Sequence, residues 1–521
     1  MRILCVYPLF PKSYWGHEYT MRLSEKRAVL PPLGLLTVAA LLPPDWEIQL
    51  CDMNVEPLRP SRLEWADVVF LSGMILQRES LLEVARAARR AGKIVVVGGP
   101  YATMSPETLE PLVDCVVVGE AEELIAPLAE LLSRGEKLPA RMKARERPDI
   151  GQSPTPRFDL LRVQAYQSLS LQSSRGCPFK CEFCDIIEIF GRKPRLKTPE
   201  QISRELDALL ATGYHGPVFV VDDNFIGNKR RAHALLEAIG AWTRMHGAPF
   251  GFYTQASVNL AADDALIEAM SKAGFSSVFL GIETPSTEAL RQANKLQNTT
   301  VDIHAAVQKL TSRGFEVMGG FIVGFDSDTA QTLDEQRRWI LESSVPLAMI
   351  GLLMALPGTQ LERRLVREGR LLRDCSGDNF IRPNFVTMMD ETELLEGYAR
   401  LLEEVYTPRA YFARASRSLE VRGEDRTGYK LPLAYAVRCL LRSLYHQGVR
   451  GAYRRDYWSF LGRVLRRSPR RFAKAIRLAI VGEHMIRYTR EDVLPRLRTN
   501  LEELRRLNIA TAESQVACSN L

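Results

Sequence analysis

Three cysteines stand close together in the stretch SSRGCPFKCEFCDI, at residues 173–186. Cys177, Cys181 and Cys184 follow the spacing Cys-x3-Cys-x2-Cys, and the other six of the nine cysteines are isolated in the sequence. A structural zinc site usually takes four ligands, often as two Cys-x2–4-Cys pairs, and no second pair follows here. Three thiolates instead suit a [4Fe–4S] cluster in which one iron stays open to a further ligand. A zinc site and purely structural thiols are the alternatives.

This triad resembles that of the radical S-adenosylmethionine (SAM) superfamily, including the aromatic residue Phe183 before the third cysteine. The resemblance implies that the open iron chelates the amino and carboxylate groups of SAM. It also implies that electron transfer from the cluster cleaves SAM to a 5′-deoxyadenosyl radical, which abstracts hydrogen. In such enzymes the cofactor supplies the difficult chemistry and the protein positions it. An external electron donor of the flavodoxin or ferredoxin type is implied as well.

Polar residues and glycines follow later strands of the same region, where the superfamily binds SAM. They are Asp222, Asp223 and Asn224 in VVDDNF, Glu283 in LGIETPS, and Gly320 and Gly324 in GGFIVGFDSDT. The resemblance implies contacts to the SAM amino group, to its methionine or ribose part, and to its adenine. The superfamily's common Gly-Gly-Glu sequence is absent, and each acid taken alone is also typical of a helix cap or a loop.

Six apolar runs separated by helical patterns must position these residues, over residues 166–385. The runs are SLSLQSS, PVFVVDDN, FGFYTQASV, SVFLGIET, VMGGFIVGF and AMIGLLMALPG. The helix TPEQISRELDALLATG has Thr198 as its N-cap, with Gln201 completing a capping box. Strands alternating with helices predict a partial (β/α)6 barrel, in which ligands collect at the carboxyl ends of the strands. The cysteine loop follows the first of these strands.

Residues 1–135 contain another series of apolar runs: RILCVYP, EIQLCDM, DVVFLSG, KIVVVGG and CVVVGE. Continuous apolar strands are buried on both faces, which predicts a parallel sheet covered by helices. We therefore expect a doubly wound, Rossmann-like α/β domain. Residues 136–165 are polar and rich in proline, so we predict a linker that runs along the outside of the molecule.

Small residues end the third, fourth and fifth strands of this first domain, and an acid follows the last of them. They are Ser72, Gly73, Gly98, Gly99, Gly119 and Glu120. Together with PPLGL at 31–35, they resemble the cobalamin-binding domains found in one group of radical SAM enzymes. The resemblance implies that the nucleotide tail of cobalamin passes between strand and helix at these positions. Each glycine taken alone is also typical of an ordinary turn.

One motif of cobalamin proteins is altered. Many of them supply an imidazole to cobalt from the sequence Asp-x-His-x-x-Gly, and the corresponding residues here read DMNVEP. Asn54 stands in place of the histidine and Pro57 in place of the glycine, and His17 is the only histidine within residues 1–135. We therefore expect cobalt without a histidine lower ligand, an arrangement that favours transfer of a methyl group as a radical.

Residues 386–521 carry no strand pattern and are predicted to form a helical, basic domain. From Arg438 to Arg490, arginines alternate with Leu, Ile, Phe and Trp, which indicates either a solvated helix face or contact with an anionic membrane surface. The net charge is +7, and no nucleic-acid recognition motif is present. No apolar run approaches the ~20 residues that cross a bilayer, and MRILCVYP is typical of a first strand rather than a signal peptide. We expect a cytoplasmic protein, peripheral on the inner face of the membrane.

Over nearly the full length, the chain resembles cobalamin-dependent radical SAM enzymes, and within them hopanoid C-2 methylases and bacteriochlorophyll side-chain methylases. The motifs that carry this resemblance are CEFCDI, FGRKPRLKTPEQI, VDDNFIGN, GIETPS and ALPGTQL. It implies transfer of a methyl group from methylcobalamin to an unactivated carbon of a hydrophobic substrate, an isoprenoid or a tetrapyrrole. The alternatives are a non-methylating rearrangement, cyclisation or oxidation with the same cofactors, and a non-enzymatic carrier or sensor of cobalamin. No residue is assigned as catalytic.

Overall fold

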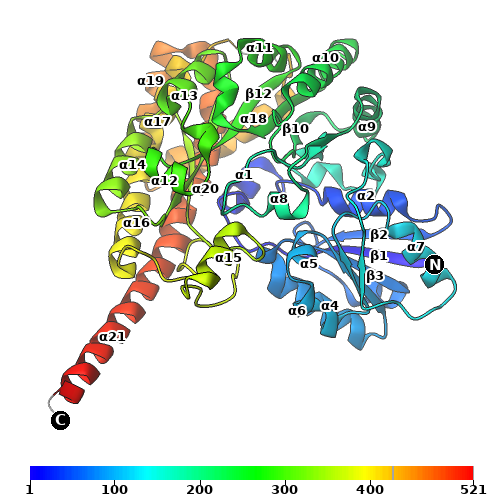
Figure 1. The fold of residues 1–521 in the computed structure, drawn as a ribbon. Coiled ribbons are helices and arrows are strands. Elements are labelled where there is room, and N and C mark those ends of the chain that lie inside the picture. Colours follow the sequence, from blue (N-terminus) through cyan, green and yellow to red (C-terminus); the bar gives the residue numbers. More distant parts are fainter. Residues whose placement is uncertain (425–427, 520–521) are drawn as a thin grey trace.

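Two parallel sheets of six strands each and a C-terminal group of helices organise the chain (Figure 1). The computed structural model describes residues 1–424 and 428–519, with side chains described as far as residue 506. The predicted fold class is confirmed: a doubly wound α/β domain is followed by a partial barrel and then by helices. Within the described part of the chain, every helix is too short or too polar to span a bilayer.

The first sheet has the strand order β2-β1-β3-β4-β5-β6, so the order reverses between β1 and β3. Its strands are β1 (Arg2–Tyr7), β2 (Glu47–Asp52), β3 (Val68–Ser72), β4 (Ile94–Gly98), β5 (Cys115–Val118) and β6 (Arg141–Lys143). The main helices around it are α2 (Leu33–Leu41), α3 (Pro60–Trp65), α4 (Arg78–Arg90), α5 (Pro100–Met104), α6 (Pro106–Leu109) and α7 (Ile125–Ser133). Apolar side chains pack on both faces of this sheet, in two separate clusters. A reversal of strand order opens a crevice at the carboxyl ends of the strands, where ligands bind in such folds.

The segment expected to be a linker takes part in the fold. Strand β6 adds to the edge of the first sheet, and Ile150 and Phe158 are buried. The Gln201 side chain donates hydrogen bonds to the carbonyls of Ile150 and Ser153, while the Ser153 hydroxyl donates to Glu122. The segment therefore bridges the two α/β domains, whereas we expected it on the outside.

The second sheet is parallel, with the order β14-β13-β12-β11-β10-β7. Its strands are β7 (Leu169–Leu171), β10 (Gly216–Val220), β11 (Phe250–Ala256), β12 (Phe275–Glu283), β13 (Glu316–Val323) and β14 (Leu347–Leu352). Its longer helices are α9 (Pro199–Ala211), α10 (Lys229–Met245), α11 (Asp264–Lys272), α13 (Ile303–Ser312), α14 (Ala330–Glu342) and α15 (Gln360–Arg367). The predicted capping box is present: Thr198 accepts a hydrogen bond from the Gln201 amide, and the Gln201 side chain accepts one from Thr198. The strands end together, so the loops after them share one edge.

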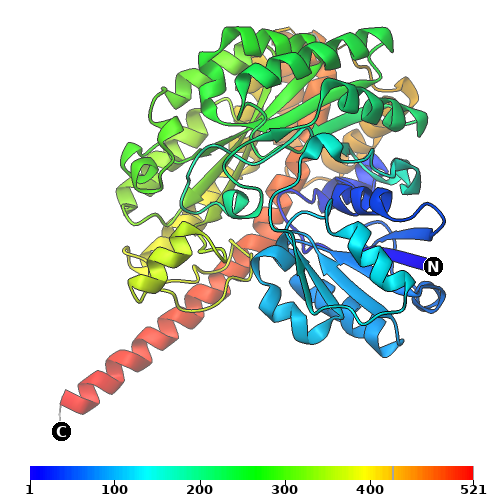
Figure 2. The same cartoon turned by 45° about the vertical axis from the view of Figure 1, so that its right-hand side comes forward.

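The C-terminal helices pack against the second sheet and against the N-terminal segment. They are α16 (Glu391–Val405), α17 (Pro408–Val421), α18 (Leu433–Ser443), α19 (Arg454–Arg467), α20 (Phe472–Tyr488) and α21 (Leu494–Ser519). The hydroxyl groups of Tyr14 and Thr489 lie 2.6 Å apart, and the Tyr488 hydroxyl donates to the Lys12 carbonyl. The far end of α21 projects away from the body of the molecule (Figures 1 and 2). Residues between β1 and α2 therefore contact the last third of the chain.

Candidate functional site

The cysteine loop leaves the second sheet at the end of β7 and is held by close backbone contacts. A short antiparallel pair, β8 (Ser174–Arg175) and β9 (Arg195–Leu196), precedes and follows the loop. Gly176 has a φ of +95°, and a Cβ there would lie 2.8 Å from the Gly191 carbonyl oxygen. The Cys177 amide donates to that same carbonyl at 3.2 Å. Only glycine fits a left-handed backbone this close to another chain segment.

The three thiols have the surroundings of a cluster site. The side-chain amide of Gln297 lies 3.5 Å from the Cys181 sulfur, and that of Asn224 lies 4.0 Å from the Cys177 sulfur. Burial raises the pKa of the thiol of Cys177, so thiolate formation needs a bound metal to displace the proton. Among the described residues, no three His, Cys, Asp or Glu side chains converge as a site for a single metal ion. A cluster does not require such convergence, because each thiolate binds a different iron. The donor set therefore fits a cluster.

A buried ion pair lies against the cysteines. Glu283, at the end of β12 with a φ of +65°, pairs with Lys295, and the ammonium lies 5.9 Å from the centre of the Phe183 ring. Burial opposes the charge on Lys295, but Glu283 and the nearby Cys181 more than offset it, so the pKa of Lys295 is raised. Thiolates at Cys181 and Cys184 would be attracted to this ammonium, whose charge Glu283 already balances in part.

Asp222, Asp223 and Asn224 follow β10 and brace the cysteine loop. The Asp222 carboxylate is fully buried and accepts four hydrogen bonds, from the backbone amides and hydroxyls of Ser173 and Ser174. Asp223 accepts a bond from the Gly176 amide at 2.8 Å, and burial raises the pKa of Asp223 to about 7. These acids therefore lie beside the triad, and the oxygens of Asp222 are already occupied by the loop.

The two glycines of the fifth motif differ in their surroundings. A Cβ at Gly320, within β13, would meet the Phe279 ring at 2.8 Å. Gly324, one residue beyond β13, donates its amide to Asp328, whose pKa burial raises to about 6. Gly320 thus makes room for an aromatic side chain of the neighbouring strand, and Gly324 begins a turn at the carboxyl edge of the sheet.

One face of the second sheet is partly exposed and mainly apolar. On β12 and β13, partly exposed residues alternate with buried ones, as the period of two in a strand requires. The partly exposed set on the middle strands includes the apolar or aromatic Tyr253, Phe279, Met318 and Ile322, together with the polar Gln255 and Ser277. The Trp15 ring, from the N-terminal segment, lies 4.8 Å from the Phe279 ring and covers part of this face.

The small residues of the first sheet gather at its carboxyl edge. Ser72 and Gly98 are paired neighbours on β3 and β4. Gly99, with a φ of +90°, lies so close to the Ser72 hydroxyl that a Cβ would overlap it, and the Gly73 carbonyl accepts a bond from the Tyr101 amide. A Cβ at Gly119, after β5, would meet no atom within 4 Å, so this end of the sheet is open. The backbone of this edge is therefore uncovered by side chains at Gly119.

Asn54 is bound within the first domain. Its side-chain amide donates to Asp52 at 2.8 Å and to the Pro8 carbonyl at 3.2 Å, and its oxygen accepts a bond from the Phe10 amide at 2.9 Å. Asn54 therefore ties the loop after β1 to the loop after β2. His17 lies elsewhere, with its Nδ1 3.0 Å from the Gln167 side-chain oxygen.

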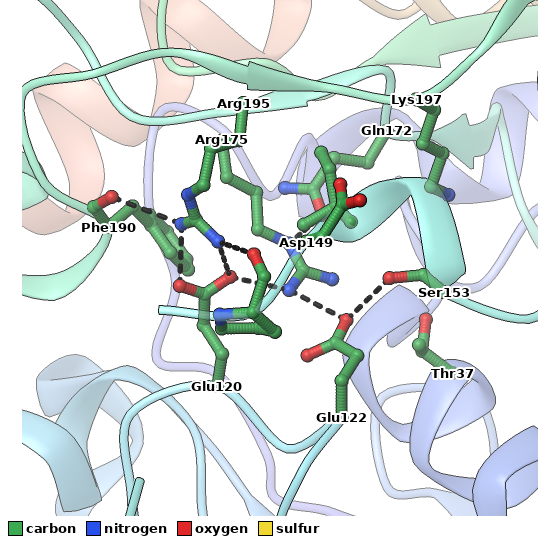
Figure 3. A network of polar contacts seen from close by, with 12 residues as sticks. Thr37, Glu120, Glu122, Asp149, Ser153, Gln172, Arg175, Phe190, Arg195 and Lys197 are labelled. Atoms are coloured by element: carbon green, nitrogen blue, oxygen red, sulfur yellow. Dashed lines mark hydrogen bonds and ion pairs between the residues drawn. The ribbon is translucent and has the colours of Figure 1, made fainter. Parts of the chain in front are cut away.

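Glu120 belongs to an ionic network that joins the two α/β domains (Figure 3). Arg195 forms two bonds with its carboxylate, at 2.6 and 3.0 Å, and Arg175 forms a third at 2.8 Å. Arg175 also pairs with Glu122 at 2.8 Å, and both arginines lie at the cysteine loop. We expected Glu120 at cobalamin, and the structure places it in this bridge, two residues after the open end of β5.

Several residues of the site escaped the sequence analysis. Arg175 carried a signal, since it lies two residues before the first cysteine in SSRGC. Lys295 and Gln297 lie at a short 3-10 turn without periodicity or a motif, so only the folded chain places them near the cysteines. Arg195 lies on β9 within FGRKPRLKTPEQI, but nothing in that motif indicates Glu120 as its partner.

Three protein families match the chain in sequence. The B12 binding domain matches residues 22–129, the Radical SAM superfamily matches residues 171–340, and a Domain of unknown function (DUF4070) matches residues 359–494. An uncharacterized methyltransferase of Synechocystis sp. is 40% identical over 96% of this chain and 95% of its own. The hopanoid C-2 methylase of Rhodopseudomonas palustris is 35% identical over 94% of both chains.

Solved structures share the fold. The cobalamin-dependent SAM radical enzyme OxsB, with aqua-cobalamin and SAM bound, superposes with a TM-score of 0.59. It covers 96% of this chain and 83% of its own, at 16% sequence identity. The similarity therefore concerns the order and packing of the domains.

Proposed function

The chain belongs to the family of cobalamin-dependent radical SAM methyltransferases, and we propose that its methyl acceptor is an unactivated carbon of a hydrophobic, polycyclic molecule. The observation that carries this substrate class is the apolar, partly exposed face of the second sheet, with Tyr253, Phe279, Met318 and Ile322. An apolar surface in a ligand site gains binding free energy mainly by burying apolar area, so it selects a hydrophobic partner. The name of the Rhodopseudomonas relative favours a hopanoid over a tetrapyrrole.

Cys177, Cys181 and Cys184 would hold a [4Fe–4S] cluster, with Lys295 and the amide of Gln297 lowering the cost of their negative charge. When bound, the cluster with SAM supplies a hydrogen-abstracting radical, and cobalamin supplies the methyl group. Asp223 and Asn224 would contact the SAM amino group, since Asp222 is already saturated by the loop. Glu283, Gly320 and Gly324 would line the rest of the SAM site, and Phe183 would shield the cluster from solvent.

The edge formed by Ser72, Gly73, Gly98, Gly99 and Gly119 would hold cobalamin. Asn54 has hydrogen-bond partners for both its amide nitrogen and its oxygen, so it braces the loops after β1 and β2 and would offer cobalt no imidazole. Cobalt then lacks a histidine ligand, and the EPR spectrum of the cob(II)alamin form should show no nitrogen superhyperfine splitting from histidine. Such splitting in the reconstituted protein would disprove this arrangement.

The deciding experiment counts the products of SAM during turnover with a hopanoid acceptor. Methyl transfer consumes two SAM molecules, one as methyl source and one as radical source, so S-adenosylhomocysteine and 5′-deoxyadenosine should form in equal amounts. A rearrangement, cyclisation or oxidation would give 5′-deoxyadenosine without a matching amount of S-adenosylhomocysteine. A carrier or sensor of cobalamin would give neither product, even with a full complement of iron and cobalt.

We also place the protein at the membrane surface during turnover, because a hopanoid-like substrate dissolves in the bilayer. Its electron donor would be a small protein of the flavodoxin or ferredoxin type, as other members of the superfamily require an external donor. Cosedimentation with vesicles tests the first statement, and reduction of the reconstituted cluster by each donor tests the second.

A further inference from the structure

An apolar stripe runs along α18 and the π-helical turn after it, residues 444–449. Its members recur every four residues: Leu433, Val437, Leu441, Tyr445 and Val449. Residues four apart lie on one face of a helix. Leu433 is 79% exposed, Leu441 59% and Val449 61%. Such an unbroken exposed apolar row on a soluble surface marks an interaction site rather than scattered surface residues.

Two aromatic residues lie at the C-terminal end of this stripe. Tyr445 is half-exposed, and Trp458 on α19 is 49% exposed while its indole N–H donates to the Gly448 carbonyl at 2.9 Å. Tyrosine and tryptophan are enriched where an apolar layer meets water. The stripe therefore ends in a pair of residues suited to an interface between lipid and water.

A basic pocket opens next to these aromatic residues, with a volume of about 310 Å³. Its basic lining consists of Arg22, His446, Arg450, Arg487 and Arg490. The single acid among the lining residues, Glu483, is engaged by Tyr453 and Arg487.

The pocket is continuous with the stripe. The Arg450 guanidinium lies 5.9 Å from the centre of the Tyr445 ring. Burial lowers the pKa of His446, and the nearby charges of Arg22 and Arg450 lower it further. Arg487 and Arg490 pair with Glu491, so Arg22 and Arg450 are the lining guanidinium groups best placed to donate hydrogen bonds to the oxygens of a phosphate.

We propose that the basic pocket binds the phosphate of an anionic phospholipid headgroup while the apolar stripe lies in the adjoining acyl boundary. Charge complementarity selects this partner: exposed Arg454 and Arg455 extend the positive surface beside the stripe. A second copy of the chain would bring two such arginine-rich faces together, and like charges across an interface oppose association. The biological role of this docking rests on the proposed function, because docking would bring the enzyme to a substrate dissolved in the bilayer. The docking itself depends only on the pocket and the stripe.

The test uses the full-length, reconstituted protein and vesicles of phosphatidylcholine, with and without phosphatidylglycerol. We expect sedimentation with the mixed vesicles only, and a loss of binding as salt increases. Each basic residue near an anionic surface contributes about fivefold to binding, so the double variant Arg22→Gln/Arg450→Gln should bind roughly 25-fold more weakly. The matched control is Arg89→Gln/Arg90→Gln, which removes two exposed arginines from α4 and should leave vesicle binding unchanged.

A second pair of variants tests the stripe. Leu441→Asp and Val449→Asp should each abolish sedimentation with mixed vesicles, and their melting curves should match that of the unaltered protein because both positions are exposed. Unaltered binding in either the pocket variant or the stripe variants would overturn the proposal. So would calorimetric binding of inorganic phosphate to the pocket without vesicle binding, which would identify a free anion as its ligand. A dimer that Leu441→Asp dissociates would assign the stripe to a second copy and overturn the proposal too.

These outcomes separate the docking surface from the chemistry. With a hopanoid held in detergent micelles, the pocket and stripe variants should still form S-adenosylhomocysteine and 5′-deoxyadenosine in equal amounts. If the proposed methyl transfer fails while vesicle binding follows the predicted pattern, only the reaction needs revision. Normal methyl transfer with no vesicle binding would remove only the docking site.

Discussion

The radical chemistry proposed for the molecule depends on the cysteine loop, in which a few residues have a tightly restricted backbone. The residue before Cys177 must turn the backbone while lying in contact with residues 190–193. Gly176 does this with a φ of +95°. Asp222 holds the start of the same loop through four hydrogen bonds. The positions of the sulfurs are therefore set by backbone geometry before any iron binds, which is the preorganisation that a cluster site needs.

We predict that Gly176→Ala lowers the iron bound after anaerobic reconstitution to less than about half, because a Cβ there meets the Gly191 carbonyl and a left-handed alanine costs roughly 1–2 kcal/mol. Iron analysis and the absorbance of the cluster measure this effect. Gly369→Ala is the control, since Gly369 has a similar φ of +69° with no atom within 4 Å of the added Cβ. Equal iron contents in the two variants would contradict the role of Gly176.

At the scale of elements, the carboxyl edge of the first sheet meets the cysteine loop of the second. Glu120 and Glu122, after β5, contact Arg175 on β8, and Arg195 on β9 completes the network (Figure 3). The side chains are largely buried, with 3% of Glu120 and 10% of Arg175 exposed. The removal of one partner from a buried pair leaves an unpaired charge, which costs about 3–5 kcal/mol. The network thus fixes the carboxyl edge of the first sheet relative to the cysteine loop.

Glu120→Gln should therefore lower the Tm by several degrees and leave radical formation poorly coupled to methyl transfer. We expect more 5′-deoxyadenosine than S-adenosylhomocysteine, because the two cofactor edges are no longer held in register. Glu123→Gln is the matched control, as Glu123 is exposed on the same loop and should leave both quantities unchanged. A normal one-to-one product ratio in Glu120→Gln would limit the network to a stabilising role.

The contact between the N-terminal segment and α20 should respond to acid. His484 is fully buried, its Nε2 donates to the Ser13 carbonyl, and burial lowers the pKa of His484 to about 3. An unfolded histidine titrates near 6.5, so between about 6.5 and 3 the unfolded chain binds a proton that the folded chain does not. The free energy of unfolding therefore decreases as the pH falls through this window, by about 1.4 kcal/mol for each pH unit.

His484→Gln keeps a donor for Ser13 and does not titrate, so its Tm should fall less than that of the unaltered protein between about pH 7 and about pH 5. The comparison with the variant is needed because Glu18, 3.7 Å from His484, has its pKa raised to about 7 by burial. A raised carboxyl pKa has the opposite sign, since it adds stability as the pH falls toward its unfolded value. Parallel pH profiles for the two proteins would exclude His484 as a source of acid sensitivity.

At the scale of the whole molecule, the chain does not fold as three separate units in sequence order. Residues 12–20 leave the first domain and pack on α20, where Lys12, Tyr14 and Tyr19 bond to residues 488–492. From this position Trp15 lies over Phe279 on the apolar face of the second sheet. The N-terminal segment therefore covers part of the surface proposed to receive the substrate, and it ties the first domain to the last.

Trp15→Ala should raise the KM for a hopanoid acceptor by roughly tenfold, equivalent to about 1.4 kcal/mol of lost apolar contact, while kcat changes much less. Steady-state formation of the methylated product measures both constants. Met245→Ala, at a position 79% exposed, is the control and should change neither. A fall in kcat with an unchanged KM would indicate that Trp15 supports the fold of the site and does not touch the substrate.

The sequence alone determined the two sheets, the helix cap at Thr198 and the cysteine triad, because strand periodicity, capping and thiolate spacing depend on residues close together in the chain. It also indicated the cofactors, since their motifs are short and local. Only the tertiary structure placed Glu120 against Arg175, Lys295 against Glu283, and the N-terminal segment against α20. These pairs join residues in different loops and elements, and a charged or aromatic side chain carries no local pattern that names its partner. Folding brings them together because the parallel sheets collect their loops at shared edges.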